Sequence, residues 1–181
     1  LIVTGGASDA TPPTLESFIL SSYEIDLSTG NQSVTAIARI IDDISGVFDG
    51  QFANGSGGSP SQARWRSPSG QIVDVVFSTP STGTYLDGEY SDQLTLSQFS
   101  ENGIWTLDYF LVNDEAGNGK SYSTEELNNL GVRTTLIVTG GASDATPPTN
   151  LILTSSGINE NSAAGTVIGN LSAVDPDAGS S

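Results

Sequence analysis

The sequence predicts an all-β protein, an immunoglobulin-like antiparallel β-sandwich with one short helix before its last strand. Short segments of alternating polar and apolar residues are separated by turns rich in Gly, Pro and Ser, and there are about seven or eight of them in about 125 residues. One tryptophan, Trp65, falls on the third main strand and the other, Trp105, on the penultimate strand. A jelly roll is the main alternative architecture.

The first half of the chain carries the clearest alternation. Phe18 and Leu20 share one face, and the segment 33–41 directs every second residue inward before residues 42–46 end the strand. The inward residues of that segment are Val34, Ala36, Ala38 and Ile40. The Gly-rich stretch 54–60 has no packing signal, so we expect a solvent-exposed loop there.

The second half continues the same pattern. A strand at residues 62–66 directs Trp65 inward and Arg64 and Arg66 outward, and strands at 71–77 and 89–96 follow. Simple alternation through residues 103–112 places four large side chains on the core side: Trp105, Leu107, Tyr109 and Leu111.

One helix is expected before the last strand. Ser123 followed by Glu126 forms a capping box, Leu127 and Leu130 provide an apolar stripe, and Gly131 ends the helix. Residues 132–138 then form the closing strand.

The first fourteen residues, Leu1 to Thr14, recur without change from Leu136 to Thr149, 136 − 1 = 135 residues later. This spacing is the size of a domain, so the chain is interpreted as part of a tandem array. We expect the tail of a preceding repeat at 1–8, the immunoglobulin-like domain at 9–140, a linker at 141–149 and the start of another domain at 150–181. Because the chain starts at Leu1 and contains no Met, we expect it to be a segment of a longer protein.

The composition excludes several functional classes. Five basic residues against 21 acidic ones give a formal charge of −16, which repels nucleic acid and anionic lipid headgroups. No apolar run has the length of a membrane span, so we expect no membrane insertion. Without Cys or His, imidazole-based nucleophilic catalysis is excluded, and we expect the protein not to be an enzyme.

Three acidic segments are predicted to converge at one pole of the sandwich. The second and sixth strands of this topology run in the same direction, so the turns that follow them emerge together, and the first strand begins at the same pole. We expect the following residues there: Asp9, Asp42, Asp43, Asn113, Asp114 and Asn118. Clustered carboxylates and carbonyls favour Ca²⁺, and fit Mg²⁺ less well. The alternative is that Asp and Asn serve only local turn hydrogen bonds.

Residues 9–14, 42–46 and 112–118 resemble segments of bacterial immunoglobulin-like repeats from large secreted or surface proteins of the adhesin and RTX type. The resemblance covers about residues 9 to 140. It implies a non-catalytic structural or adhesive module, located outside the cell or on its surface and stiffened by Ca²⁺. Its expected partners are neighbouring repeats of the same chain, and other surface proteins or glycans.

Residues 159–161 and 165–179 resemble the opening of a bacterial cadherin-like repeat. This resemblance implies that Glu160, Asp175 and Asp177 are calcium ligands, with Asp144 in the linker facing the Asp175 and Asp177 pair.

A carbohydrate-binding module is the leading alternative function, because aromatic side chains can stack on sugars. Of the five candidate rings, Trp65, Trp105 and Tyr109 are expected in the core, and Tyr85 lies in a loop. The fifth is Tyr90, on the strand at 89–96.

Overall fold

The computed structural model describes residues 8–50, 59–141, 149–155 and 157–174, which belong to two compact units. The first unit is Leu1–Gly141 and the second is Ala142–Ser181, and each is treated by itself. The predicted residue Asp144 and the pair Asp175 and Asp177 lie outside the described residues.

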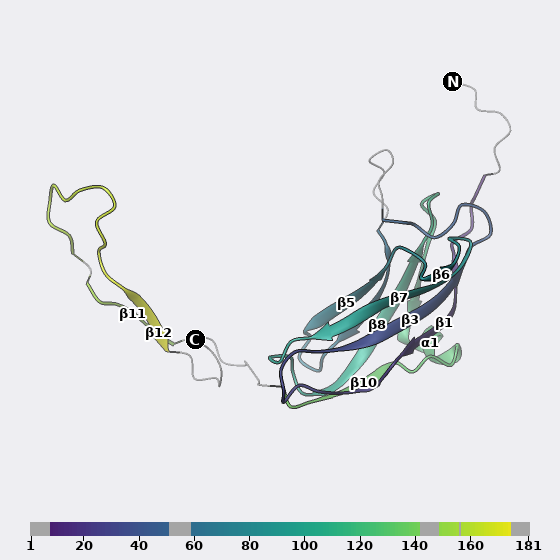
Figure 1. Cartoon of the computed structure of the whole chain (residues 1–181), viewed down its shortest axis with the longest axis horizontal. Helices are drawn as coiled ribbons and strands as arrows, with labels where there is room; N and C mark the ends of the chain where they lie inside the picture. Colours follow the sequence, from purple (N-terminus) through teal and green to yellow (C-terminus); the bar gives the residue numbers. More distant parts are fainter. Residues whose placement is uncertain (1–7, 51–58, 142–148, 156, 175–181) are drawn as a thin grey trace, which may run out of the picture. The chain divides into compact units, whose positions relative to one another are not determined.

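Two stacked β-sheets form the first unit (Figure 1). In the first sheet the strand order is β1-β3-β7-β6, and all pairs are antiparallel. Its strands are β1 (Thr14–Leu20), β3 (Gln32–Ile41), β7 (Asp87–Leu96) and β6 (Thr82–Gly83).

The second sheet has the order β2-β10-β8-β4-β5. Its strands are β2 (Glu24–Asp26), β10 (Thr135–Thr139), β8 (Gly103–Asn113), β4 (Ser61–Arg66) and β5 (Ile72–Phe77). The strand β9 (Gly119–Ser123) also pairs with β8, and only β2 and β10 run parallel. The chain therefore switches sheets between β1 and β2, and the predicted antiparallel sandwich is confirmed.

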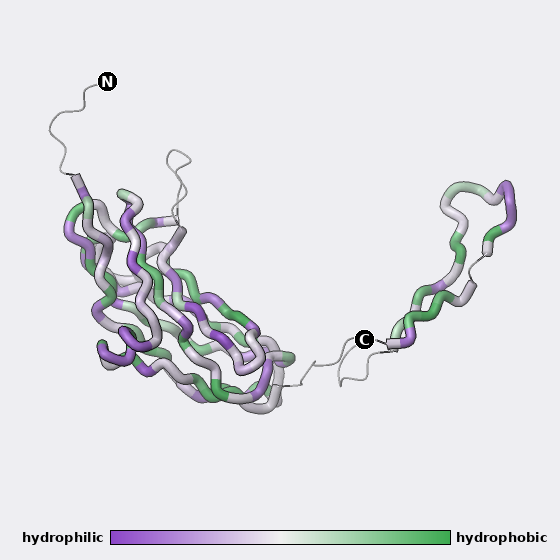
Figure 2. The backbone as a smooth tube through the Cα atoms, turned by 180° about the vertical axis from the view of Figure 1, so that it is seen from behind, coloured by the Kyte–Doolittle hydropathy of each residue, from purple (hydrophilic) through white to green (hydrophobic). Residues whose placement is uncertain are grey.

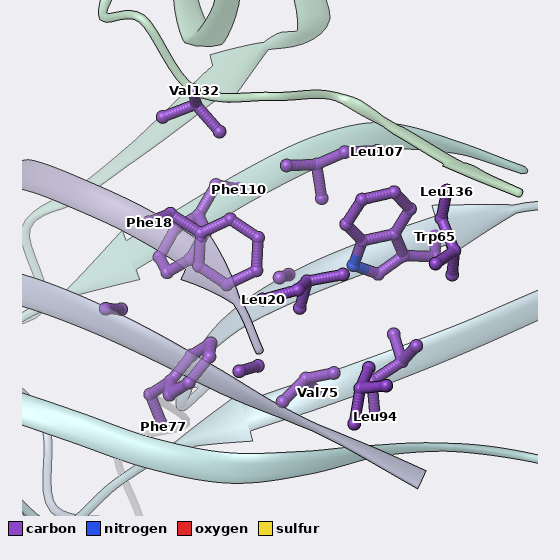
Figure 3. Packing of buried hydrophobic residues seen from close by; sticks show 14 of the residues in the cluster. Phe18, Leu20, Trp65, Val75, Phe77, Leu94, Leu107, Phe110, Val132 and Leu136 are labelled. Atoms are coloured by element: carbon purple, nitrogen blue, oxygen red, sulfur yellow. The ribbon is translucent and has the colours of Figure 1, made fainter. Parts of the chain in front are cut away.

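The core lies between the two sheets and is built from the inward face of each strand. Phe18 packs against Phe77 and Phe110 with ring centroids 6.2 and 5.3 Å apart, and Trp65 lies beside them (Figure 3). The predicted inward residues of β1 and β3 are buried, and so are Tyr90, Leu94 and Leu96 of β7. In Figure 2 the tube of the first unit changes repeatedly between hydrophilic and hydrophobic colours. Burial of alternate residues on two facing sheets is what defines the sandwich.

The prediction for the second half of β8 was wrong. Trp105 and Leu107 are buried as expected, but Tyr109 and Leu111 are only half-buried, and Phe110 and Val112 take the core positions instead. The register with β4 shifts at this point, because Arg64 pairs with Tyr109 while Trp65 pairs with Leu107. The extra residue, Asp108, forms a β-bulge that moves all following side chains to the opposite face.

The short helix α1 (Thr124–Asn129) packs against β8 and β9. Its capping box forms as predicted: the Ser123 hydroxyl accepts a hydrogen bond from the Glu126 N–H, and the Glu126 carboxylate accepts one from the Ser123 N–H. Leu127 is buried, but Leu130 is 47% exposed, so the predicted two-residue apolar stripe was half wrong. Among the described residues no helix has the length and apolarity that crossing a membrane requires.

The second unit contains one antiparallel pair, β11 (Thr149–Leu153) with β12 (Leu171–Val174). Figure 2 colours much of this pair as hydrophobic, and its apolar side chains are exposed, for example Leu151 at 72% and Leu171 at 67%. Glu160 lies in the connection between the two strands and is exposed.

Candidate metal centre

Three carboxylates from distant parts of the chain meet at one end of the first unit. Asp9 precedes β1, Asp42 follows β3 and Asp114 follows β8, and each offers one oxygen within 4.8 Å of the others. We call this end of the sandwich the Asp9 pole. The opposite end, where β10 runs into Gly140 and Gly141, is the Gly141 pole.

Asp42 is fixed by the tight turn that ends β3. Its Oδ2 accepts hydrogen bonds from the backbone N–H groups of Gly46 at 2.6 Å and Ile44 at 3.2 Å. Its Oδ1 is shielded from solvent and has no hydrogen-bond partner in the part of the chain that the structure describes. One oxygen of this carboxylate therefore holds the turn, and the other remains available.

Asp114 is the most deeply buried acid of the site, with only 1% of its surface exposed. A bridge to Val47 holds its backbone, and Asn118 donates to both carboxylate oxygens, each at 2.7 Å, from its backbone N–H and its side-chain amide. The same amide nitrogen lies 3.5 Å from Asp9 Oδ1. The amide of Asn118 thus directs its N–H bonds toward two of the three carboxylates.

Asp9 reaches the site from residues 9–13, which precede β1 and which we call the N-terminal linker. Its Oδ2 accepts a hydrogen bond from the Ser45 N–H at 2.9 Å, and its Oδ1 accepts one from the Thr11 N–H at 3.2 Å. The pKa of the Asp9 carboxyl is lowered, first by the adjacent Ser45 hydroxyl and then by these N–H groups, against an opposing effect of desolvation. The Ser45 hydroxyl lies beside this carboxylate without completing a hydrogen bond of normal geometry. Asp9 is therefore ionised at neutral pH.

No basic side chain neutralises this charge in the part of the chain that the structure describes. The sequence has five basic residues, and three pair with other acids: Arg39 with Asp87, Arg64 with Asp74 and Arg66 with Asp108. The remaining two lie over aromatic rings, Lys120 over Tyr122 and Arg133 over Tyr23. Among the described residues, the three clustered acids therefore form no ion pair with a basic side chain.

The other residues predicted for this pole lie outside the cluster. Asp43 is exposed and accepts a hydrogen bond from the Thr11 hydroxyl at 2.8 Å. Asn113 donates to the Ser59 carbonyl at 2.7 Å and fixes the start of β4. Both support the loops around the site, which is the turn-forming role that the alternative interpretation gave to Asp and Asn.

Sequence reasoning missed the contributions of Ser45 and Gly46. Both donate a backbone N–H to a carboxylate of the cluster, Ser45 to Asp9 and Gly46 to Asp42. Every residue except proline carries a backbone N–H, so the sequence does not show which of these groups donate to the site. The one available signal was Gly46 itself, whose φ of +88° suits a glycine in a tight turn.

The aromatic residues offer little surface for stacking on sugars. Trp65, Trp105 and Tyr90 are each at most 1% exposed. Tyr109 is half-buried beneath Arg64, which lies 5.1 Å from the ring centroid. Tyr85 is 38% exposed and stands alone among these five rings.

The three acids offer only oxygen atoms as ligands, which hard cations prefer.

Comparison with known proteins does not assign the chain to a family or a function. No protein-family model matches the chain, and neither curated proteins nor solved structures give a significant match. The resemblance to bacterial immunoglobulin-like repeats thus stays a prediction from short motifs, and function has to be inferred from the geometry of the Asp9 pole.

Proposed function

We propose that the chain is a non-catalytic structural or adhesive repeat module of an extracellular protein, and that Ca²⁺ at the Asp9 pole stiffens its junction with a preceding repeat. The observation that supports this most is Asp114, 1% exposed, beside two further carboxylates with no basic partner among the described residues. The extracellular location and the bacterial origin rest on the sequence resemblance alone.

Buried charge without a counter-charge is costly. Desolvation disfavours an ionised carboxylate, and buried charges in proteins are accordingly paired or bound to metal ions. The two amide hydrogen bonds from Asn118 lower this cost but bring no positive charge. A divalent cation between Asp9, Asp42 and Asp114 would supply it.

Calcium suits the spacing of the oxygens. Ca²⁺ binds oxygen at about 2.3–2.6 Å, so two ligands on opposite sides of one ion stand about 4.6–5.2 Å apart. The three carboxylate oxygens lie within 4.8 Å of one another and can therefore share one ion without movement of the backbone. Water and the Asn118 side chain, with its amide turned so that its oxygen faces the ion, would complete six to eight ligands.

The mechanical consequence follows from where Asp9 lies. Asp9 belongs to the N-terminal linker, whereas Asp42 and Asp114 belong to loops of the sandwich. One ion would hold the linker against both loops, and Pro12 and Pro13 would carry this restraint into β1 because proline fixes φ. Asp144 is the copy of Asp9 at the second junction, where we propose the same role toward the cadherin-like segment.

Thermal unfolding in excess Ca²⁺ and in chelator tests the proposal. At a free concentration one hundred times Kd, binding to the folded state adds about 2.7 kcal/mol to the free energy of unfolding. For a domain of this size we expect Tm to rise by roughly 8 to 12 °C. An unchanged midpoint at millimolar Ca²⁺ would contradict the proposal.

Matched variants locate the effect. Asp114→Ala and Asp42→Ala should each remove most of the calcium-dependent shift, because each deletes one carboxylate of the cluster. Asp74→Ala is the control, since Asp74 is an acid on the outer face of β5 that pairs with Arg64. It should keep the full shift even if its baseline Tm falls.

The stiffening itself needs a separate measurement. Backbone ¹⁵N relaxation should show higher order parameters at Ala10 and Thr11 in Ca²⁺ than in chelator, because Asp9 becomes fixed by the ion. Stabilisation without this change would mean that calcium supports the fold but does not restrain the linker.

A further inference from the structure

Tyr90 is a fully buried tyrosine whose hydroxyl has no hydrogen-bond partner among the described residues. It lies on β7 opposite Ala38, and its side chain is 0% exposed. Four buried side-chain polar atoms lack a hydrogen-bond partner among the described residues, and three belong to this region: Asp42 Oδ1, Ser45 Oγ and Tyr90 Oη. The fourth, the Trp65 indole nitrogen, is elsewhere in the core.

The ring of Tyr90 points toward the Asp9 pole. Gly88 lies two residues closer to that pole on β7, and a Cβ built on Gly88 would stand 3.1 Å from Cε2 of Tyr90. Cε2 adjoins the carbon that bears the hydroxyl, so the ring extends over Gly88 in the direction of Asp42. Burial raises the pKa of Tyr90, and electrostatic interaction with the Tyr85 and Asp42 side chains raises it further. The hydroxyl is therefore a neutral donor near the cluster.

An unpaired buried hydroxyl is unfavourable, because the group loses its hydrogen bonds to water on burial and gains none in return. Buried polar atoms without protein partners commonly bind an internal water, which typically makes about three hydrogen bonds. The three unpaired atoms of this region would provide such a set. Calcium, in turn, needs more oxygen ligands than three carboxylates supply.

We propose that the Tyr90 hydroxyl forms the inner wall of the cation site and hydrogen-bonds a water molecule that the bound ion carries. The inference rests on the calcium site proposed above and adds a residue to it. Tyr90 does not touch the ion in this arrangement. It is a positioning residue that acts through the water, with Asp42 Oδ1 and Ser45 Oγ on the other sides.

Tyr90→Phe removes only the hydroxyl. In chelator its Tm should equal or exceed that of the unchanged chain, because an unsatisfied polar group is lost. In titrations with CaCl₂ the affinity should fall by about 3- to 10-fold, the share of one neutral hydrogen bond. A purely structural hydroxyl would give the reverse, with a lower Tm in chelator and an unchanged affinity.

Tyr122→Phe is the matched control. Tyr122 is also buried, but its hydroxyl accepts a hydrogen bond from the Leu15 N–H at 3.1 Å. Its loss should lower Tm equally in chelator and in Ca²⁺ and leave the calcium affinity unchanged.

Terbium provides a second readout, since Tb³⁺ replaces Ca²⁺ at oxygen sites and its luminescence lifetimes in H₂O and D₂O count the bound water molecules. We expect at least one bound water in the unchanged chain. No bound water, or a calcium affinity of Tyr90→Phe within 1.5-fold of the unchanged chain, would overturn the role of Tyr90 while leaving the calcium site in place. Absence of any calcium response in the unchanged chain would instead overturn the site itself.

Discussion

The two poles of the sandwich use the same residue types with different results. At the Gly141 pole every acid or amide considered below finds a donor or acceptor in the backbone. At the Asp9 pole three acids gather, and buried polar atoms have no hydrogen-bond partner among the residues that the structure describes. The presence of acidic turns therefore does not distinguish a binding site from turns that only support the fold. The buried polar atoms without hydrogen-bond partners make that distinction.

At the Gly141 pole, Asp26, Glu101 and Asn102 all form hydrogen bonds with the backbone. Asp26 accepts from the Ser28 N–H at 2.9 Å, and Glu101 accepts from the Ser69 N–H at 2.9 Å. Asn102 exchanges two hydrogen bonds with the backbone of Gly141, its amide nitrogen donating at 2.9 Å and its amide oxygen accepting at 2.7 Å. These side chains serve the turns that carry them, as Asp and Asn do in most loops.

The largest effect that distinguishes the two poles is expected from Asp42→Asn. If this variant left both stability and the calcium response unchanged, the proposed difference between the poles would be wrong. An asparagine can keep the hydrogen bonds from Gly46 and Ile44 through its oxygen, while its amide group replaces the unpaired Oδ1 and removes one negative charge from the cluster. We expect the free energy of unfolding in chelator to rise by about 1 kcal/mol. The calcium-dependent stabilisation of about 2.7 kcal/mol should be lost almost entirely.

Thermal or denaturant unfolding with and without Ca²⁺ measures both effects in one experiment. Stability in chelator should rise while the stabilisation by Ca²⁺ is lost. This combination is informative, because a variant that only damages the fold would lose stability in both conditions. Retention of the full calcium response in Asp42→Asn would show that the cluster is not the binding site.

The fold and the position of the cluster could be predicted from the sequence because both depend on strand alternation and strand direction. The buried faces of β1, β3 and β7 follow from residue polarity alone. Since parallel-running strands end at the same pole, Asp42 and Asp114 could be brought together without coordinates.

The rest depended on geometry that residue types do not encode. The bulge at Asp108 inserts one residue and reverses the burial of Tyr109 and Leu111, and simple alternation cannot reveal it. Within the acidic segments, only the structure separates Asp114 from the exposed Asp43. The direction of the Tyr90 ring depends on packing against Gly88 and had no sequence signal.

A substitution at the Gly141 pole tests whether that pole takes part in calcium binding. Asn102→Ala removes both hydrogen bonds to Gly141, and we expect a loss of about 1 kcal/mol in the free energy of unfolding. The loss should be the same in Ca²⁺ and in chelator, as seen by denaturant unfolding. A loss that appears only in Ca²⁺ would mean that the Gly141 pole also takes part in ion binding.

The smallest expected effect concerns pH at the Gly141 pole. The pKa of Asp26 is lowered, first by the hydrogen bond from the Ser28 N–H and then by the Ser28 hydroxyl. Because the folded-state pKa is lower than the unfolded value of about 4, Asp26 contributes stability above that value. This contribution is lost as pH falls through the folded-state pKa.

Asp26→Asn should therefore be slightly less stable than the unchanged chain at pH 7, and the difference should disappear as the pH is lowered from 5 toward 3. Tm measured in calcium-free buffer across this range tests it, because without Ca²⁺ no ion competes with protons at the Asp9 pole. Asparagine keeps an oxygen that can accept from the Ser28 N–H, so only the contribution of the charge is lost. A difference that persists unchanged at pH 3 would mean that Asp26 acts through shape and not through ionisation, and that the charge of this one carboxylate contributes nothing to stability.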